Sequence, residues 1–540
     1  MASDTPQVRQ LVIALLVIAV FLPRLTSLGT MLTVDEGLWR GRGEQFIKSF
    51  PSGHFNKTLV AGQPGVTTAW LAGLSLPWRS LASAQAAIAV TCGALILLIT
   101  YSLSRLWGFW WGMASGFLLA LDPFLLAHSR LVHTDALFAL FYLASLLWLL
   151  LALEPAWQAG LPSRRHIVIS GILGGLALLT KIFTTILIPT VTCIFLLAAW
   201  RSRKHLGETF RSGIIWLVAV VLTTLALWPA LWTAPDQVAQ YLTGRATLHV
   251  AEGTHVGETT ATWWYYGRES IFRLSAITTL LLIPAAIAAF KSRDRMWRTA
   301  LILLISGIAF AIVLSFSSEK SDRYILISLL TLDLFAVMGL RKINEWVSYL
   351  QSERSRPNSG DLARGAGLPS YSPAQAGRTT QENRSQDLGR LEASDGARKT
   401  TGWVAPTIAI TLLAIGAARI HPYYLAHHNA LYPVEERHKL GWGEGLEQAA
   451  QWIKKQGYTG KIASYYAGVM KYWYPGPVDP LNHIDGTSAR YIVLYRSMFE
   501  RGPGHVDTEI VAEYLDNASR QPAHIISINN LPYVWIFERE

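Results

Sequence analysis

Two neighbouring acidic residues, Asp35 and Glu36, directly follow the first long apolar segment of the chain. Carboxylates can accept protons, and ionised side chains are costly to hold close to hydrocarbon. An acidic pair at the mouth of a membrane helix is therefore a hypothesis for a functional site. The alternative is that both are ordinary loop carboxylates that happen to follow a helix, and their position alone does not decide between the two.

A second group of polar residues lies in the short turn before a later apolar run, where His128, Arg130, His133 and Asp135 occur close together. Histidine and aspartate can bind a metal ion, but their spacing here matches no strong zinc signature. A salt bridge between Arg130 and Asp135 that stabilises the helix ends is the structural alternative. Anion binding by Arg130 is the functional interpretation.

Three further cations, Lys181, Lys320 and Arg323, lie where apolar runs begin or end. An isolated lysine at such a place commonly extends to the lipid headgroups, which is the simplest interpretation of each. Together with Arg130, however, they project to the same membrane boundary as Asp35. Several cations on one boundary are suited to binding the phosphate of a membrane lipid.

The elements that must position these residues are membrane helices. Of the 540 residues 51% are hydrophobic and 15% charged, and the mean hydropathy is +0.28, which excludes an ordinary soluble enzyme. The net charge of +11 is spread over short clusters between apolar runs, which membrane topology explains better than nucleic-acid binding. Cys92 and Cys193 both lie inside apolar runs, so we expect no disulfide framework.

Apolar runs long enough to cross a bilayer as helix recur along the chain. We expect about 11 transmembrane helices, the first of them uncleaved. The fifth and sixth form either one tight hairpin around Lys181 or a single long helix with a re-entrant piece. The expected spans are 8–28, 84–106, 109–128, 133–153, 167–182, 184–200, 213–231, 271–290, 298–316, 322–340 and 402–419.

Basic clusters at 164–165, 201–204, 291–295 and 341–342 all fall on one side under this assignment. The positive-inside rule makes that side the cytoplasm. We therefore expect a multi-pass protein of the plasma membrane whose acidic pair and cations face the extracytoplasmic side. The spacing of Asp35, Glu36 and Arg40 suits a short amphipathic helix on the membrane surface, with Trp39 as its anchor.

Composition divides the chain into four parts. A membrane module covers residues 1–350, with long outer loops at 29–83 and 232–270, and the last membrane helix covers 401–419. Between them, residues 351–400 are rich in Ser, Arg, Gly, Gln and Pro, which predicts a disordered cytoplasmic linker.

Residues 420–540 predict an extracytoplasmic α/β domain, with a helix at 444–455 and strands at 491–495, 524–528 and 533–537. Nothing in this domain forms a recognisable catalytic constellation. Its role is left open by the sequence.

The order of these pieces along the chain resembles that of the lipid-carrier-dependent glycosyltransferases of the GT-C superfamily. The likeness is to bacterial members of glycosyltransferase family 39, which are relatives of protein O-mannosyltransferases and of the aminoarabinose transferase that modifies lipid A. The segments that carry it are 34–36, 63–70, 129–135, 175–181, 228–232, 320–324, 421–424 and 441–446.

The resemblance implies a GT-C-like fold, an extracytoplasmic site and a polyprenyl-phosphate-linked sugar donor. It assigns Asp35 as the catalytic base, with Glu36 beside it, and predicts inversion at the anomeric carbon as the lipid phosphate leaves. The sugar would be mannose-like or another hexose, and the acceptor hydroxyl would belong to a protein, a lipid or a glycan. The residues that it makes candidates for substrate binding are Gln63, Arg130, His133, Asp135, Lys181, Lys320, Arg323 and Tyr324.

Two positions depart from the family pattern. Gln63 stands where histidine is expected before Pro64, and Ile327 stands where relatives often carry a proline. The sequence names no metal ligand and implies no cofactor, and it leaves a divalent metal open. It implies no nucleic-acid partner.

Two other functions remain as alternatives. A transporter or flippase of a lipid-linked or anionic substrate would use the same charged residues as a pathway, but the sequence has no internal repeat to support it. A membrane scaffold that presents residues 420–540 would lose all function when that domain is removed and would not need Asp35.

Overall fold

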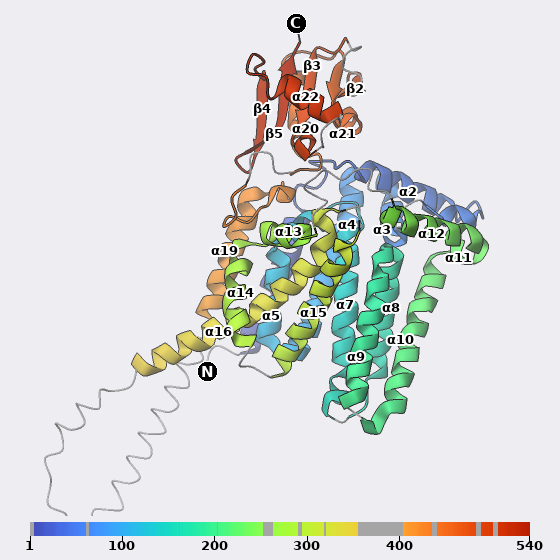
Figure 1. Cartoon of the computed structure of the whole chain (residues 1–540), viewed down its shortest axis with the longest axis vertical. Coiled ribbons are helices and arrows are strands. Elements are labelled where there is room, and N and C mark those ends of the chain that lie inside the picture. Colours follow the sequence, from blue (N-terminus) through green and yellow to red (C-terminus); the bar gives the residue numbers. More distant parts are fainter. Residues whose placement is uncertain are drawn as a thin grey trace, which may run out of the picture.

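The computed structural model describes residues 5–60, 64–158, 160–201, 203–251, 263–289, 294–317, 320–354, 403–434, 440–481, 488–500 and 506–539. A bundle of long helices carries a small sheet domain at one end, and the N-terminus lies at the other end (Figure 1). The described part of the expected linker is the end of α16, and residues 355–400 of that linker lie outside the described residues.

Nine of the eleven expected spans fall mainly on one helix each and two fall on a pair of helices, which confirms the polytopic fold. Among the described residues, seven helices are long and apolar enough to cross a membrane, or up to eight if the bent pair of α13 and α14 counts as one span. The helices of the bundle are α1 (Pro6–Leu25), α4 (Leu81–Trp107), α5 (Phe109–Leu121), α7 (Asp135–Leu153), α8 (Arg164–Thr180), α9 (Leu187–Arg201), α10 (Leu206–Leu227), α14 (Ala276–Ala289), α15 (Arg295–Ser315), α16 (Leu326–Arg354) and α19 (Val404–Ile420).

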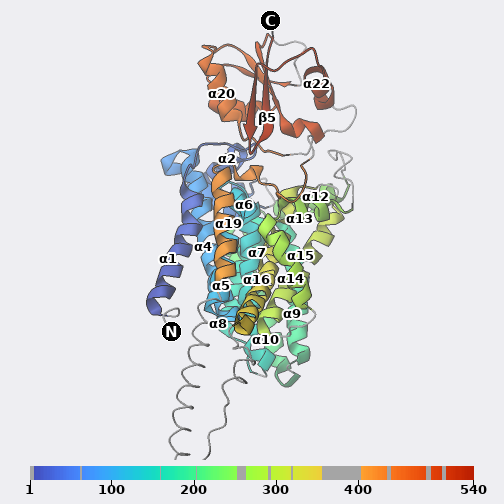
Figure 2. The ribbon, with the colours of Figure 1, turned by 90° about the vertical axis from the view of Figure 1, so that its left-hand side faces the viewer.

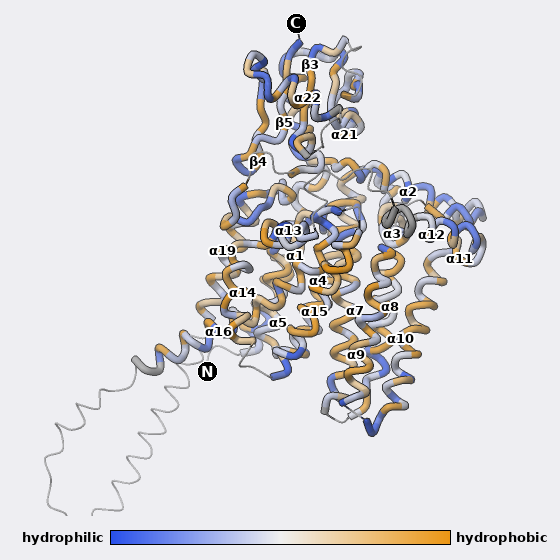
Figure 3. The backbone as a smooth tube through the Cα atoms, viewed as in Figure 1, coloured by the Kyte–Doolittle hydropathy of each residue, from blue (hydrophilic) through white to orange (hydrophobic). Residues whose placement is uncertain are grey.

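The apolar residues form a band over the long helices, with polar residues at both ends of the bundle (Figure 3). Every residue of α7 is buried, whereas α1 buries only Leu16, Val20 and Arg24. The first helix therefore turns most of its surface to lipid, and α7 forms the centre of the bundle. Gly171 of α8 allows close packing there, since a Cβ would lie 2.6 Å from the backbone oxygen of Trp216 in α10.

Two expected spans are interrupted. The run 109–128 breaks at Asp122, whose carboxylate accepts a hydrogen bond from the Leu125 amide at 2.6 Å and starts a separate short helix. The run 271–290 also breaks, because α13 and α14 meet at an angle of 112°. Between α8 and α9 the short turn Ile182–Ile186 makes a hairpin, so the single long helix is wrong.

Short helices cover the end of the bundle that faces the sheet domain (Figure 1). They position most of the polar residues singled out in the sequence. These helices and helical turns are α2 (Glu36–Lys48), η2 (Phe55–Thr58), α3 (Val66–Leu74), η3 (Leu76–Trp78), α6 (Pro123–His128), η5 (Ile182–Ile186), α11 (Ala230–Thr233), α12 (Pro235–Ala251), α13 (Tyr265–Arg273), η7 (Asp322–Ile325) and η9 (Tyr424–Ala426). The opposite end has η4 (Pro155–Gln158) and η6 (Arg203–His205).

The C-terminal domain is a five-stranded mixed sheet in the order β2-β1-β3-β5-β4, with helices beside it (Figure 2). The strands β1, β2 and β3 are parallel, and β5 runs antiparallel to β3 and β4. The elements are α20 (Leu446–Lys455), β1 (Ile462–Ser464), α21 (Ala467–Trp473), β2 (Val478–Pro480), β3 (Tyr491–Tyr495), η11 (Arg496–Glu500), α22 (Val506–Tyr514), β4 (His524–Ile528) and β5 (Leu531–Glu538).

The sequence predicted α20 and the three long strands of this domain. Asn529 and Asn530, both with positive φ, make the tight turn between β4 and β5. The strands β1 and β2 were not predicted, because segments of three residues are too short to show a periodic pattern.

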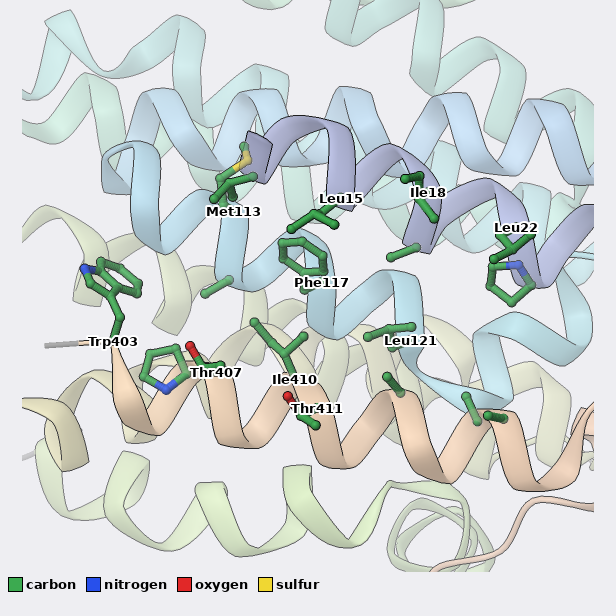
Figure 4. A pocket seen from close by; sticks show the side chains of 18 of the residues that line it. Leu15, Ile18, Leu22, Met113, Phe117, Leu121, Trp403, Thr407, Ile410 and Thr411 are labelled. Atoms are coloured by element: carbon green, nitrogen blue, oxygen red, sulfur yellow. The ribbon is translucent and has the colours of Figure 1, made fainter. Parts of the chain in front are cut away.

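A long apolar groove of about 970 Å³ lies between α1, α5 and α19. Side chains from all three helices line it, among them Leu15, Phe117 and Ile410 (Figure 4). A smaller pocket of about 530 Å³ lies between α13, α15 and α16, with Trp264 and Ile312 in its wall.

Candidate active site

Asp35 occupies the N-cap position of α2 but makes no capping hydrogen bond with its side chain. The carboxylate instead faces His133, at 3.4 Å from Nε2, and Arg323, at 3.7 Å from Nη2. Burial acts to raise the pKa of Asp35, but the hydrogen bond from His133 and the charge of Arg323 outweigh it and hold that pKa below its ordinary range. With 31% of its side chain exposed, Asp35 is an ionised carboxylate that an incoming group can reach.

Glu36, although adjacent, is fully buried. Its Oε2 accepts hydrogen bonds from the amide (2.8 Å) and hydroxyl (3.2 Å) of Thr33, and its Oε1 accepts from Gln85 Nε2 and the Val132 amide, both at 2.9 Å. Burial raises the pKa of Glu36, although these four hydrogen bonds oppose the shift. Glu36 thereby joins the Asp35 loop to α4 and to the turn before α7.

The most deeply buried part of the cluster is Asp135, in the first turn of α7. Its two carboxylate oxygens contact Lys181 Nζ, His133 Nδ1 at 2.6 Å and Arg323 Nε at 3.5 Å. The position at a helix N-terminus favours this negative charge. His133 therefore lies between two carboxylates, with Asp35 at one ring nitrogen and Asp135 at the other.

Lys181 follows the last residue of α8 and is 1% exposed, so the interpretation that it extends to the headgroups is wrong. Its ammonium lies 4.3 Å from the ring centre of Tyr324, a cation–π distance. Its backbone forms an isolated antiparallel bridge with Pro64. Tyr324 is thus placed beside the cluster, whereas Gln63 lies outside the described residues.

Arg323, in the turn η7, connects the cluster to the C-terminal domain. Its guanidinium lies 4.2 Å from the ring centre of Trp442, and the same ring meets His133 edge to face at 4.9 Å. The Val34 amide donates a hydrogen bond to the Trp442 carbonyl at 3.2 Å. Trp442 was not among the predicted site residues; its position in a Gly-Trp-Gly-Glu-Gly segment was the available signal.

Arg130 lies apart from this cluster. Its Nη2 donates to the carbonyls of Thr26 (2.6 Å) and Ser27 (3.1 Å), and the guanidinium lies 5.3 Å from the ring centre of Tyr424. Burial lowers the pKa of Arg130. The salt bridge to Asp135 considered in the sequence analysis is wrong, because the described partners of Asp135 are Lys181, His133 and Arg323.

Lys320, partly buried just before η7, has no ion pair within the described part of the chain. Burial lowers its pKa. Arg323 and Tyr324 follow it closely in the sequence, but within the described residues no ion pair or cation–π contact joins Lys320 to the cluster.

The amphipathic helix expected after Asp35 is present as α2, but Trp39 does not anchor it to the membrane. Trp39 is 4% exposed and its ring lies over Gly65, where a Cβ would come within 2.1 Å of the indole. The φ of +71° at Gly65 suits glycine for a second reason. Trp39 therefore holds the start of α3 against the site, and it also contacts His133 at 5.9 Å.

Within the described residues no group of three or more His, Cys, Asp or Glu side chains could hold a metal ion. In particular, His128, His133 and Asp135 form no such group, although the sequence analysis considered them together. The ring of His128 instead packs edge to face against Phe124 at 4.7 Å.

Residues 65–232 match the family model for dolichyl-phosphate-mannose-protein mannosyltransferase. No curated protein matches the sequence. Among solved structures, ArnT from Cupriavidus metallidurans bound to undecaprenyl phosphate is similar, with 13% identity, a TM-score of 0.52 and coverage of 99% of this chain and 98% of that chain. The apo form of the same protein has 14% identity, a TM-score of 0.50 and coverage of 98% and 97%.

These comparisons confirm the resemblance that the sequence motifs indicated. The chain shares the GT-C-like fold of ArnT, and the family match covers the segment that contains Arg130, His133, Asp135 and Lys181. It is a multi-pass membrane protein.

Proposed function

We propose that this chain transfers a sugar from a polyprenyl-phosphate donor to an acceptor hydroxyl, with Asp35 as the base. The observation that carries the proposal is the asymmetry of the cluster: one carboxylate, Asp35, is partly exposed and held ionised beside Arg323, while the other, Asp135, is buried and pairs with Lys181. The family match and the shared fold support the same reaction class.

In the proposed reaction, Asp35 accepts the proton of the acceptor hydroxyl as its oxygen attacks the anomeric carbon. A bond forms between that oxygen and the anomeric carbon, and the bond from the carbon to the phosphate oxygen breaks on the opposite face. The configuration of the sugar, a mannose-like or other hexose, is therefore inverted. The electron pair of the broken bond leaves on the lipid phosphate.

The growing negative charge on that phosphate needs cations that are already in place. Lys181 and Arg323 are fixed by Asp135, by Tyr324 and by Trp442, and we propose that Lys320, three residues before Arg323 in the sequence, adds to their charge. Such preorganised charges stabilise a transition state without reorganisation, and each is commonly worth about 10²–10³ in rate. Both carboxylate oxygens of Glu36 accept hydrogen bonds, from Thr33, from Gln85 of α4 and from the Val132 amide. Glu36 therefore acts in this proposal as a positioning residue.

The cluster lies at the end of the bundle that carries the C-terminal domain, where α7 begins and α8 ends. The basic residues Arg164, Arg201 and Arg295 begin or end helices at the other end. By the positive-inside rule, this distribution supports our proposal that the reaction takes place on the extracytoplasmic face of the plasma membrane. A cluster at the boundary supports a transferase over a transporter, which would need charges at mid-membrane depth.

The most direct test is Asp35→Asn with purified protein and a panel of polyprenyl-phosphate sugars, assayed by mass spectrometry of released polyprenyl phosphate. We expect this variant to insert and fold normally, and its rate of polyprenyl-phosphate release to fall about 10²–10⁴-fold. Glu44→Gln is the matched control, since Glu44 lies on the same helix and pairs with exposed Lys48. Full activity of Asp35→Asn would exclude Asp35 as the base.

The pocket between α13, α15 and α16 is the proposed site of the first isoprenoid units of the donor. Ser315 and Phe316 line it shortly before Lys320 in the sequence, and Ser328 lines it shortly after Tyr324. We expect Ile312→Trp, which fills this pocket, to raise the KM for donor. Ile410→Trp, which fills the groove of Figure 4 instead, is the matched control and should leave that KM unchanged. The opposite result would place the donor chain in the groove.

A further inference from the structure

The loop of residues 440–445, which directly precedes α20 of the C-terminal domain, reaches into the candidate active site. Trp442 of this loop contacts both side chains that face Asp35, at 4.2 Å from the Arg323 guanidinium and 4.9 Å from the His133 ring. Its carbonyl also accepts a hydrogen bond from the Val34 amide, one residue before Asp35. Trp442 of the C-terminal domain therefore makes three separate contacts at the site, with Arg323, His133 and Val34.

The conformation of this loop is set by the C-terminal domain itself. The hydroxyl of Tyr495, in β3, accepts a hydrogen bond from the Gly443 amide and donates one to Glu444, both at 2.9 Å. Glu444 is fully buried and also accepts a hydrogen bond from the Trp442 amide. The sheet thus fixes the backbone on both sides of the indole.

The two glycines that flank Trp442 show how closely the loop is fitted. Gly441 has a φ of +93° and Gly443 a φ of +126°. A Cβ at Gly441 would lie 2.4 Å from the Tyr495 hydroxyl, and one at Gly443 would lie 2.6 Å from the Leu32 carbonyl oxygen. The loop therefore fills the space between the sheet and the segment that leads to Asp35.

We propose that Trp442 is a positioning residue, through which the C-terminal domain completes the active site by holding His133 and Arg323 against Asp35. This inference rests on the proposed function, since Asp35 is the base there. The indole covers the guanidinium on one side and supports the imidazole at its edge. Without it, one face of the Arg323 guanidinium, whose side chain is 21% exposed, is open to water, which weakens its ion pairs with Asp35 and Asp135.

The charged groups that face Asp35 come from three elements. His133 lies in the turn before α7, Arg323 lies in η7, and Asp135 begins α7. The first two favour the ionised carboxylate and the third opposes it. When Trp442 no longer holds His133 and Arg323 in place, they stabilise the ionised form of Asp35 less. The repulsion by Asp135 and the effect of burial then dominate, and the pKa of Asp35 rises.

The test compares Trp442→Ala with Trp442→Phe in the full-length protein. We expect the alanine variant to lose about 10–100-fold in kcat, because misplaced catalytic groups lose that order of rate, with the KM for donor nearly unchanged. The acid limb of its pH profile should move to higher pH, because Asp35 is then protonated at higher pH. The phenylalanine variant retains an aromatic ring against Arg323. It should therefore keep most of the wild-type kcat and show a smaller shift of the acid limb than the alanine variant.

Trp452→Phe is the matched control, because Trp452 stacks on His524 elsewhere in the same domain at 5.0 Å. A wild-type rate and an unshifted pH profile in Trp442→Ala would overturn the inference. So would equal losses in Trp442→Ala and Trp452→Phe, since these would indicate a general effect of the domain.

A second measurement is independent of turnover. Infrared difference spectroscopy of the carboxyl band, assigned by its loss in Asp35→Asn, should show Asp35 taking up its proton at higher pH in Trp442→Ala than in the wild type. An unshifted band would overturn the inference. If the wild type released no polyprenyl phosphate while the band shifted as expected, the proposed function would fail and the positioning role of Trp442 would stand.

Discussion

Two arginine sites at the end of the bundle that carries the sheet domain, centred on Arg130 and on Arg323, hold their charge in opposite ways. Arg130 donates to backbone carbonyls of Thr26 and Ser27. Arg323 lies between the carboxylates of Asp35 and Asp135. The hydrogen bonds of Arg130 to backbone carbonyls occupy its guanidinium. Arg323 instead pairs with two carboxylates, one of them partly exposed, so its positive charge can also interact with an incoming anionic group.

The difference separates two roles that the sequence had combined. Both arginines follow apolar runs and both were candidates for binding a phosphate. Arg130 now connects the loop after α1 to the turn before α7, and Tyr424 covers it. Variants of the two residues should therefore fail in different assays.

The largest effect is expected for Arg323→Met. It removes a charge that faces both carboxylates, so we expect the rate of polyprenyl-phosphate release to fall about 10²–10³-fold, the usual cost of one preorganised charge. Initial rates at saturating donor measure it. Arg323→Lys keeps the charge but lacks the planar guanidinium, so its rate should lie between those of the wild type and Arg323→Met. A rate for Arg323→Met within threefold of the wild type would remove Arg323 from the site.

Arg130→Met is the counterpart and should chiefly affect stability. It removes the hydrogen bonds to the carbonyls of Thr26 and Ser27, and hydrogen bonds from a charged group contribute about 1.5–3 kcal/mol each. We expect a lower midpoint in thermal unfolding followed by size-exclusion chromatography, and a transfer rate per folded molecule within about fivefold of the wild type. Lost transfer at unchanged stability would make Arg130 a substrate ligand and remove the contrast.

The smallest effect is expected for Glu36→Gln, which tests whether the carboxylate beside Asp35 is only structural. An amide has one acceptor oxygen, so it cannot meet donors from Thr33, Gln85 and Val132 at both positions, and a loss of about 1–2 kcal/mol follows. Transfer by the folded protein should remain. A variant that is stable but inactive would give Glu36 a catalytic role.

The raised pKa of Glu36 adds a pH dependence to the same experiment. The folded state binds this proton more tightly than the unfolded state, so the free energy of unfolding falls as pH rises from the ordinary value of 4.5 toward the raised one. Thermal midpoints measured across this range should decline in the wild type. The decline should be smaller in Glu36→Gln, which has no proton to lose.

The helices of the bundle could be predicted because the bilayer fixes both their length and their composition. The break at Asp122 could not, since the residues around it continue the apolar run. For the same reason the bend between α13 and α14 was missed: Leu274 and Ser275 resemble many residues inside membrane helices.

The candidate site was predicted in part. The acidic pair and the cations were found because such residues are expensive near hydrocarbon, a property of each residue alone. The separation of Asp35 from Glu36, and of Arg323 from Arg130, depends on partners that are distant in sequence, such as Gln85 and Trp442. No local pattern around either pair could have predicted it.

The hydrogen bond between Val34 and Trp442 connects two segments that are far apart in the sequence. During synthesis, Asp35 would be in place long before the indole that lies against its neighbours. A chain cut short before the sheet domain would carry every charged residue of the cluster and still lack a wall of the site. The proposed activity would then begin only once the sheet domain has folded against the bundle, so folding of this domain would control when the site becomes active.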